Sequence, residues 1–138
     1  KIAAVAGADF YEIKPAEPYT GADLNWMNKN SRSSMEMNNP SARPAIAGNT
    51  LDMAAYDTVI IGFPIWWGVA PRIIETFLES YDFSGKKIIP FCTSGGSGIG
   101  TAESDLKDLA GSGNWIEGRR FGGNVSEADL QSWIEGLM

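Results

Sequence analysis

An apolar run, an amphipathic segment and a second apolar run follow one another in the middle of the chain, and this succession constrains the fold most. Residues 56–64 (YDTVIIGFP) show no alternation of polar and apolar side chains, which is typical of a strand covered on both faces. Residues 70–82 (APRIIETFLESYD) place apolar side chains on one face at helical spacing, and Pro71 suits the first helical turn. Residues 84–94 (SGKKIIPFCTS) repeat the strand pattern. The sequence therefore predicts a βαβ unit with two parallel strands.

The C-terminal part continues the alternation of strand and helix. Residues 100–113 (GTAESDLKDLAGSG) have the pattern of a helix that Thr101 caps. Residues 114–121 (NWIEGRRF) are predicted to form a short last strand, and residues 126–138 (SEADLQSWIEGLM) a final helix that Ser126 caps. Strands and helices that alternate across short loops predict a doubly wound parallel sheet.

The N-terminal third has weaker patterns. Residues 1–6 are predicted to be the end of a helix, and residues 9–13 a strand. The connection 15–55 is polar and rich in Asn, Ser and Pro, and we expect one helix within it, near residues 22–38. With 138 residues, of which 43% are hydrophobic, the chain can form a substantial core, so we expect one α/β domain over residues 1–138.

The charge balance and the missing residue types exclude several functions. The formal net charge is −6, so a nucleic-acid partner is not expected, whereas basic partner proteins are. The chain has no histidine, which excludes Ser-His-Asp and Cys-His catalysis. Its acidic residues form no metal-ligand pattern, and Glu75, Glu79 and Asp82 are expected at the surface. We therefore expect neither a catalytic residue nor a metal site.

The cysteine content and the hydropathy bear on the compartment. Cys92 is the single cysteine and lies in an apolar run, so no intrachain disulfide forms and a reducing, cytoplasmic setting is favoured. No apolar stretch approaches the ~20 residues that cross a bilayer. Only a signal or anchor upstream of Lys1 would change that expectation.

Two loops follow the predicted strands of the βαβ unit at their carboxyl ends. The first, FPIWWGVAP (63–71), holds the adjacent Trp66 and Trp67, and the second, TSGGSG (93–98), is rich in glycine. The glycine spacing matches neither a P-loop, nor a dinucleotide fingerprint, nor a serine-nucleophile elbow. Ligands of open parallel sheets bind outside the carboxyl ends of the strands. Indoles that face a glycine-rich loop therefore indicate a slot for a planar aromatic ring.

These loops, read as GFPIWWGVAP (62–71) and FCTSGGSGIG (91–100), resemble those of the flavodoxin-like family of FMN-binding proteins, in particular bacterial flavodoxins. Residues 84–91 and 23–36 also look like that group, so the resemblance covers residues 9–138. It implies a three-layer sandwich with strand order 2-1-3-4-5 and FMN as the prosthetic group. The residues that it places around FMN are Pro64, Ile65, Trp66, Trp67, Gly68, Thr93, Ser94, Gly95, Gly96, Ser97 and Gly98.

Within the implied site, either Trp66 or Trp67 stacks on the flavin ring. Gly68 is expected to turn its peptide toward the N5 position of the flavin, because a residue without Cβ makes such a flip at low cost. The family begins with a central strand and a Ser/Thr-Gly loop around the phosphate, and the sequence from Lys1 onward supplies neither. As printed, the chain is therefore expected to bind FMN weakly or not at all.

Three functions are compatible with these residues. The favoured one is electron transfer with redox partner proteins whose basic docking surfaces are attracted by the acidic chain. The first alternative is an NAD(P)H-dependent quinone or flavin oxidoreductase of the same fold, and the second is a binding module that has lost FMN. Arg119 and Arg120 are expected to be a solvated pair rather than a site for a nicotinamide phosphate, and Trp115 a packing residue or a shield of the site.

Overall fold

The predicted βαβ unit is the centre of the molecule. The computed structural model describes residues 2–48, 51–94 and 98–137. Strands β1 (Thr58–Pro64) and β2 (Lys87–Thr93) pair in parallel along their whole lengths, and helix α3 (Arg72–Ser80) connects them. The β-branched run forms a strand, as the apolar pattern predicted, but only one of its faces is fully covered, since Ile61 and Phe63 are buried whereas Gly62 and Pro64 are exposed.

The predicted last strand is present but divided. Both β3 (Asn114–Trp115) and β4 (Arg119–Phe121) pair in parallel with β2, the first at its amino end and the second at its carboxyl end. Between them, the backbone N–H of Gly118 donates to the carboxylate of Glu103 and not to β2. This side-chain acceptor replaces a ladder partner, so the strand is interrupted where the pattern predicted one continuous element.

Helix α4 (Gly100–Lys107) and the 3-10 turn η2 (Asp108–Ala110) follow β2, and α5 (Glu127–Leu137) ends the chain. The cap of α4 was predicted wrongly. The helix begins at Gly100, so Thr101 lies inside its first turn, and no side chain caps it. Ser126 does cap α5, since its Oγ accepts a hydrogen bond of 3.1 Å from the backbone N–H of Asp129.

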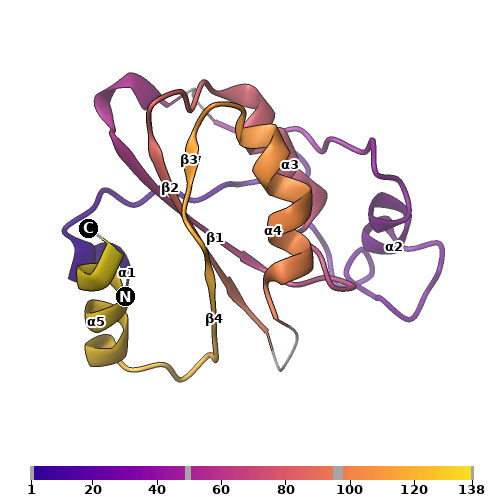
Figure 1. The fold of residues 1–138 in the computed structure, drawn as a ribbon. Helices are drawn as coiled ribbons and strands as arrows, with labels where there is room; N and C mark the ends of the chain where they lie inside the picture. The colour runs from indigo at the N-terminus through magenta and orange to yellow at the C-terminus, as the bar shows by residue number, and fades with distance from the viewer. Residues whose placement is uncertain (1, 49–50, 95–97, 138) are drawn as a thin grey trace.

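The helices form two layers, one on each side of the sheet. Figure 1 shows α3 and α4 over one face and α5 with the short α1 (Ile2–Ala6) over the other. The expected three-layer α/β sandwich is therefore confirmed, with β1, β2 and the β3/β4 pair in the places of strands 3, 4 and 5 of the expected order. The core between the sheet and α3 and α4 is apolar. It includes Ile61, Phe63, Ile74, Phe77, Leu78, Ile88, Cys92, Ala102 and Leu106.

The strand predicted at residues 9–13 is absent. These residues have no strand partner in the described chain, and the nearest backbone pairing is an isolated bridge between Pro15 and Ile46. β1 is the edge of the described sheet, and residues 9–13 do not pair with that edge. The segment packs by its side chains instead, and the ring of Tyr11 lies 6.3 Å from that of Phe77.

The helix predicted near residues 22–38 is much shorter. Only α2 (Arg32–Met37) forms, followed later by the 3-10 turn η1 (Met53–Ala55). In the segment before α2, polar side chains take the backbone N–H groups that a helix would use. Asn25 accepts from the N–H of Met27, and Asn28 from that of Asn30. Such local bonds favour turns over a helix.

An ion-pair network ties the long connection to α3. Arg43 contacts Glu75 and Glu79 at 2.9 Å each, and Arg72 contacts Glu75 at 2.8 Å. Glu75 is only 6% exposed, so its expected place at the surface was wrong. Arg72 also donates to the carbonyl of Met37 at 2.8 Å, which fixes the end of α2 against α3.

The described part of the chain has neither a membrane-spanning helix nor a cluster of metal ligands. No helix there is long and apolar enough to cross a bilayer. No group of histidine, cysteine, aspartate and glutamate side chains in those residues is arranged to hold a metal ion.

Candidate functional site

The first predicted loop is a tight hairpin turn at the carboxyl end of β1. The backbone groups of Trp66 and Val69 bond reciprocally, at 2.8 and 3.1 Å. The two residues between them have positive φ, 49° at Trp67 and 81° at Gly68. Two central residues of positive φ match a hairpin turn of type I′, in which glycine is favoured and tryptophan is strained. The turn therefore presents Trp67, 52% exposed, at its tip.

The strain at Trp67 gives a prediction about stability. Trp67→Gly and Trp67→Ala remove the same ring, but only glycine adopts this φ without the left-handed penalty of about 1–2 kcal/mol. We expect the glycine variant to be more stable than the alanine variant by about 1 kcal/mol in urea unfolding. At an ordinary position the order is reversed, so an alanine variant of equal or greater stability would contradict the turn.

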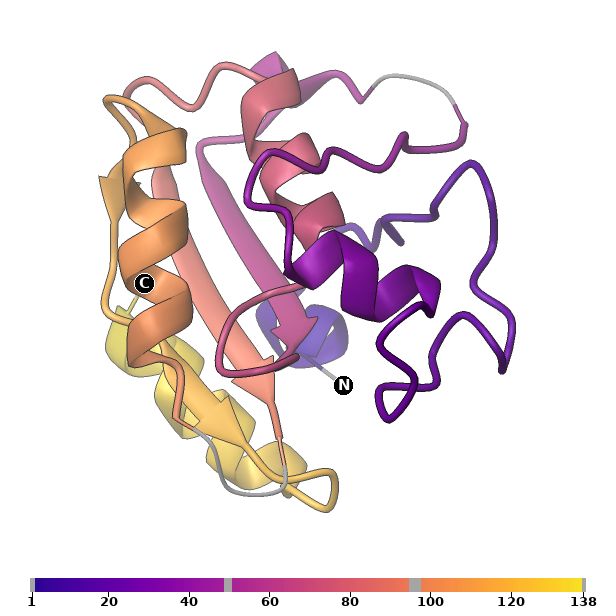
Figure 2. The ribbon, with the colours of Figure 1, turned by 90° about the vertical axis from the view of Figure 1, so that its right-hand side faces the viewer.

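The second tryptophan of the pair is held from the side. Trp66 is half-buried, and the ring of Tyr19 meets it edge to face with ring centres 5.7 Å apart. Tyr19 is fixed in turn, since the guanidinium of Arg32 lies 3.9 Å from its ring centre and its hydroxyl donates to the carboxylate of Glu36. Arg32 and Glu36 also form an ion pair of 2.9 Å on α2. The long connection therefore orients Trp66, and Figure 2 shows α2 beside the end of β1.

The environment of Tyr19 gives a prediction about pH. Burial and then the hydrogen bond and charge of Glu36 raise the pKa of Tyr19 above its usual value near 10. The native state thus keeps a proton that the unfolded state loses, so this contribution is intact below pH 10 and declines as the pH rises toward the native pKa. We expect Tyr19→Phe to reduce the slope of unfolding free energy against pH between pH 9 and 11. Identical slopes in the two proteins would contradict the contact.

The second predicted loop begins where β2 ends. Pro64 and Thr93 are register partners, and the N–H of Ile65 donates to the carbonyl of Thr93 at 3.3 Å, so the starts of the two loops are joined. Gly95, Gly96 and Ser97 lie outside the described residues. Thr93 and Gly98 are exposed, and Ser94 is half-buried. The structure therefore brings Pro64, Ile65, Trp66, Trp67 and Gly68 to the same edge of the sheet as Thr93 and Ser94.

One residue of this edge was misjudged from the sequence. Arg120 is not half of a solvated pair, because its Nε donates to the Oγ of Ser94 at 3.0 Å and its Nη2 to the carbonyl of Ser94 at 2.8 Å. Arg119 does point elsewhere, with its guanidinium 5.1 Å from the ring centre of Phe121. Two consecutive arginines in a strand face opposite sides, a signal that was available once the strand was recognised.

The suggestion that Trp115 shields the site was wrong. Trp115 is paired with Ile88, near the amino end of β2, and its indole N–H donates to Glu103 at 3.3 Å. The predicted loops lie at the opposite end of that strand. Cys92 is a core residue, as expected, and burial raises the pKa of its thiol despite the opposing charge of Arg120.

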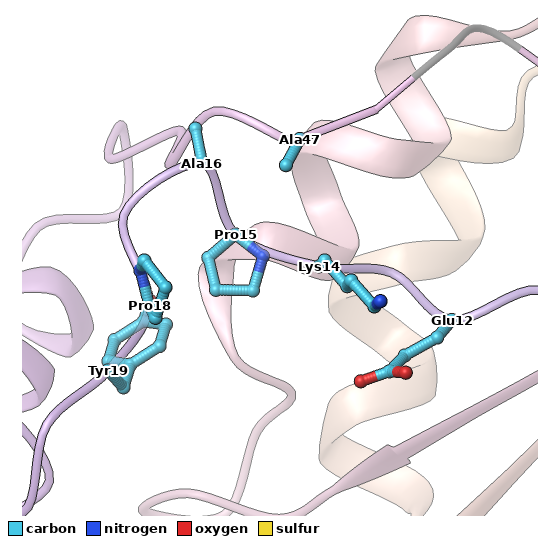
Figure 3. Close-up of a pocket in the computed structure, with 7 residues that line it drawn as sticks. All are labelled: Glu12, Lys14, Pro15, Ala16, Pro18, Tyr19 and Ala47. Carbon is cyan, nitrogen blue, oxygen red and sulfur yellow. The ribbon is translucent and has the colours of Figure 1, made fainter.

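A hollow lies near the first loop and not between the two loops. It measures about 510 Å³ and is lined by Glu12, Lys14, Pro15, Ala16, Pro18, Tyr19 and Ala47 (Figure 3). Its link to the predicted site is Tyr19, the residue that contacts Trp66. None of the described residues of the two loops (64–68, 93–94 and 98) lines it. Nothing in the sequence patterns had singled out residues 12–19.

The site's geometry suits a flat ligand with a polar edge. One wall is aromatic and partly exposed, and the facing loop begins with hydroxyl side chains. A Cβ at Gly68 or at Gly98 would meet no atom within 4 Å, so space remains open above both positions. The parallel sheet with helices on both faces defines a flavodoxin-like α/β domain, and both loops lie at the carboxyl ends of β1 and β2, where ligands of open parallel sheets bind.

The chain belongs to the flavodoxin family, which residues 1–137 match. A candidate flavoprotein of Bacteroides eggerthii DSM 20697 is 48% identical, with a TM-score of 0.91 over 99% of this chain and 85% of its own. One from Bacteroides uniformis ATCC 8492 is 49% identical, with a TM-score of 0.92 over 97% and 85% of the two chains. A Lactobacillus acidophilus NCFM flavoprotein solved in complex with FMN is 26% identical, with a TM-score of 0.62 over 88% and 78%. No curated protein matches the chain.

Proposed function

We propose that the protein binds FMN at the joined loops of residues 64–68 and 93–98 and transfers electrons to and from partner proteins. The observation that carries the proposal is the strained turn that holds the exposed indole of Trp67 beside a hydroxyl- and glycine-rich loop. Backbone strain of this kind persists where the surrounding structure enforces it, and it gathers at ligand sites. The FMN complex of the Lactobacillus relative supports the choice of ligand.

The protein's own residues bind and orient the ring. Trp66, supported by Tyr19, supplies an aromatic face whose position is set before the ligand arrives. Thr93 and Ser94 supply hydroxyl groups, and Gly68 supplies a peptide that turns at low cost. The flavin, when bound, supplies the redox chemistry.

The negative net charge of the chain supports electron transfer to and from basic partner proteins. The net charge of −6 produces a long-range field that attracts positively charged proteins and accelerates their encounter. This attraction is screened by salt, with a Debye length of about 10 Å at 0.1 M ionic strength. The buried thiol of Cys92 fits a reducing cytoplasm.

One experiment separates this function from its alternatives. The protein is loaded with FMN, and its reduction is followed by visible absorbance in a potentiometric titration and then with NADPH plus a quinone. Two separated one-electron steps without NADPH turnover are expected of the carrier. Steady NADPH oxidation would contradict it and indicate the oxidoreductase, whereas a colourless protein with no thermal shift on adding FMN would indicate the binding module.

A further inference from the structure

Arg120 makes a two-pronged contact that is distinct from the other arginine contacts of the chain. Its Nε and Nη2 donate to the side-chain oxygen and the backbone oxygen of one residue, Ser94, at 3.0 and 2.8 Å. The planar guanidinium carries these two donors in a fixed geometry, so the contact restricts both the rotamer of Ser94 and the direction of its peptide. Ser94 is the first residue after β2.

This contact joins a third strand to the edge that holds the proposed flavin loops. β4 pairs with β2 so that Cys92 is opposite Arg120 and Thr93 is opposite Phe121. On the other side of β2, the N–H of Ile65 bonds to the carbonyl of Thr93. The start of the glycine-rich loop is therefore fixed from both neighbouring strands. Ser94 is therefore the residue whose orientation sets the direction in which the chain leaves β2.

The charge of Arg120 is not neutralised by a carboxylate in the described part of the chain. Arg32, Arg43 and Arg72 each form an ion pair of 2.8–2.9 Å with a glutamate. Arg120 has hydroxyl and carbonyl partners only, and it is half-buried. A cation in such a setting is screened less than one in bulk water, and it favours negative charge nearby.

We propose that Arg120 is a positioning residue of the flavin site, which fixes Ser94 at the carboxyl end of β2, and that its charge favours the reduced form of the ligand. The inference rests on the proposed FMN binding. It goes beyond that proposal because it assigns part of the FMN affinity and part of the reduction potential of bound FMN to one side chain. Lysine retains the charge but not the two-pronged contact, whereas glutamine lacks the charge. The two properties can therefore be separated.

The test compares Arg120→Gln, Arg120→Lys and the control Arg119→Gln by FMN fluorescence titration and by potentiometry. Arg120→Gln is expected to weaken the binding of oxidised FMN about tenfold and that of reduced FMN about 100-fold. The tenfold difference between the two forms lowers the two-electron reduction potential by about 30 mV. Arg120→Lys is expected to weaken FMN binding while the potential stays near that of the wild type. Arg119→Gln should match the wild type in both measurements.

The outcomes that overturn the inference differ from those that overturn the proposed function. If wild-type protein and all variants bind FMN alike and share one potential, Arg120 has no role in the site. If Arg120→Gln does not fold, Arg120→Lys decides, because unchanged affinity in that variant contradicts a positioning role. Failure of the wild-type protein to bind FMN contradicts the proposed function itself.

Discussion

Trp66→Ala is expected to weaken FMN binding about 10- to 100-fold. The indole of Trp66 is held by the ring of Tyr19 and by the backbone bridge to Val69, so its face is already in place when the ligand binds. Stacking of a base on an aromatic side chain contributes about 1–3 kcal/mol by alanine substitution, and a flavin ring offers a comparable flat surface. At 1.4 kcal/mol for each factor of ten, this energy gives the expected loss.

The measurement is a titration of FMN fluorescence with the wild-type and Trp66→Ala proteins. Trp115→Phe is the matched control, since that residue lies near the amino end of β2 and touches neither loop. Its dissociation constant should equal that of the wild type. Equal affinities of the wild-type and Trp66→Ala proteins would show that Trp66 has only a packing role.

Gly118→Ala is expected to lower the free energy of unfolding by about 2–4 kcal/mol. A Cβ there would lie 2.7 Å from the carbonyl oxygen of Pro90 and 2.7 Å from the carboxylate of Glu103. Both groups are constrained, the first by β2 and the second by its bonds to Gly118 and Trp115. Overpacking costs about 1–3 kcal/mol, and a strained hydrogen bond adds about 1 kcal/mol.

The chain provides a matched control in Gly123. A Cβ at that position meets no atom within 4 Å, and its φ is not positive. Gly123→Ala should therefore be neutral or stabilise the protein by up to about 1 kcal/mol, because alanine restricts the unfolded chain. Urea unfolding of the two variants measures the difference. Similar stabilities would contradict the enclosed position of Gly118 before β4.

The elements that could be predicted from the sequence are those with a strong local period. The strands of residues 58–64 and 87–93 have continuous apolar patterns, and the helix between them has a one-sided apolar pattern. All three elements form where these patterns predicted them. The prediction of a strand at residues 9–13 was wrong, because a strand requires a neighbouring strand with which to pair and these residues have none in the described chain. The helix near residues 22–38 failed because Asn side chains compete for the backbone donors.

The positions of the two loops could be predicted from the sequence, whereas the side chains that hold these loops could not. The two loops followed from their positions at strand ends and from the resemblance, and the register of Pro64 with Thr93 places their starts together. Tyr19 and Arg120 were missed, because each is 26 or more residues from its partner in the chain and no local pattern encodes the contact. Only folding brings these residues to the loops that they hold.

The central claim is that the joined loops bind a flavin. Titration of the purified full-length protein into FMN, followed by the visible absorbance and the fluorescence of the flavin, tests it most directly. We expect one FMN per chain, quenched fluorescence from contact with an indole, and a weaker complex when Trp66 is replaced by alanine. A flavin spectrum that stays that of free FMN at all protein concentrations would contradict the account.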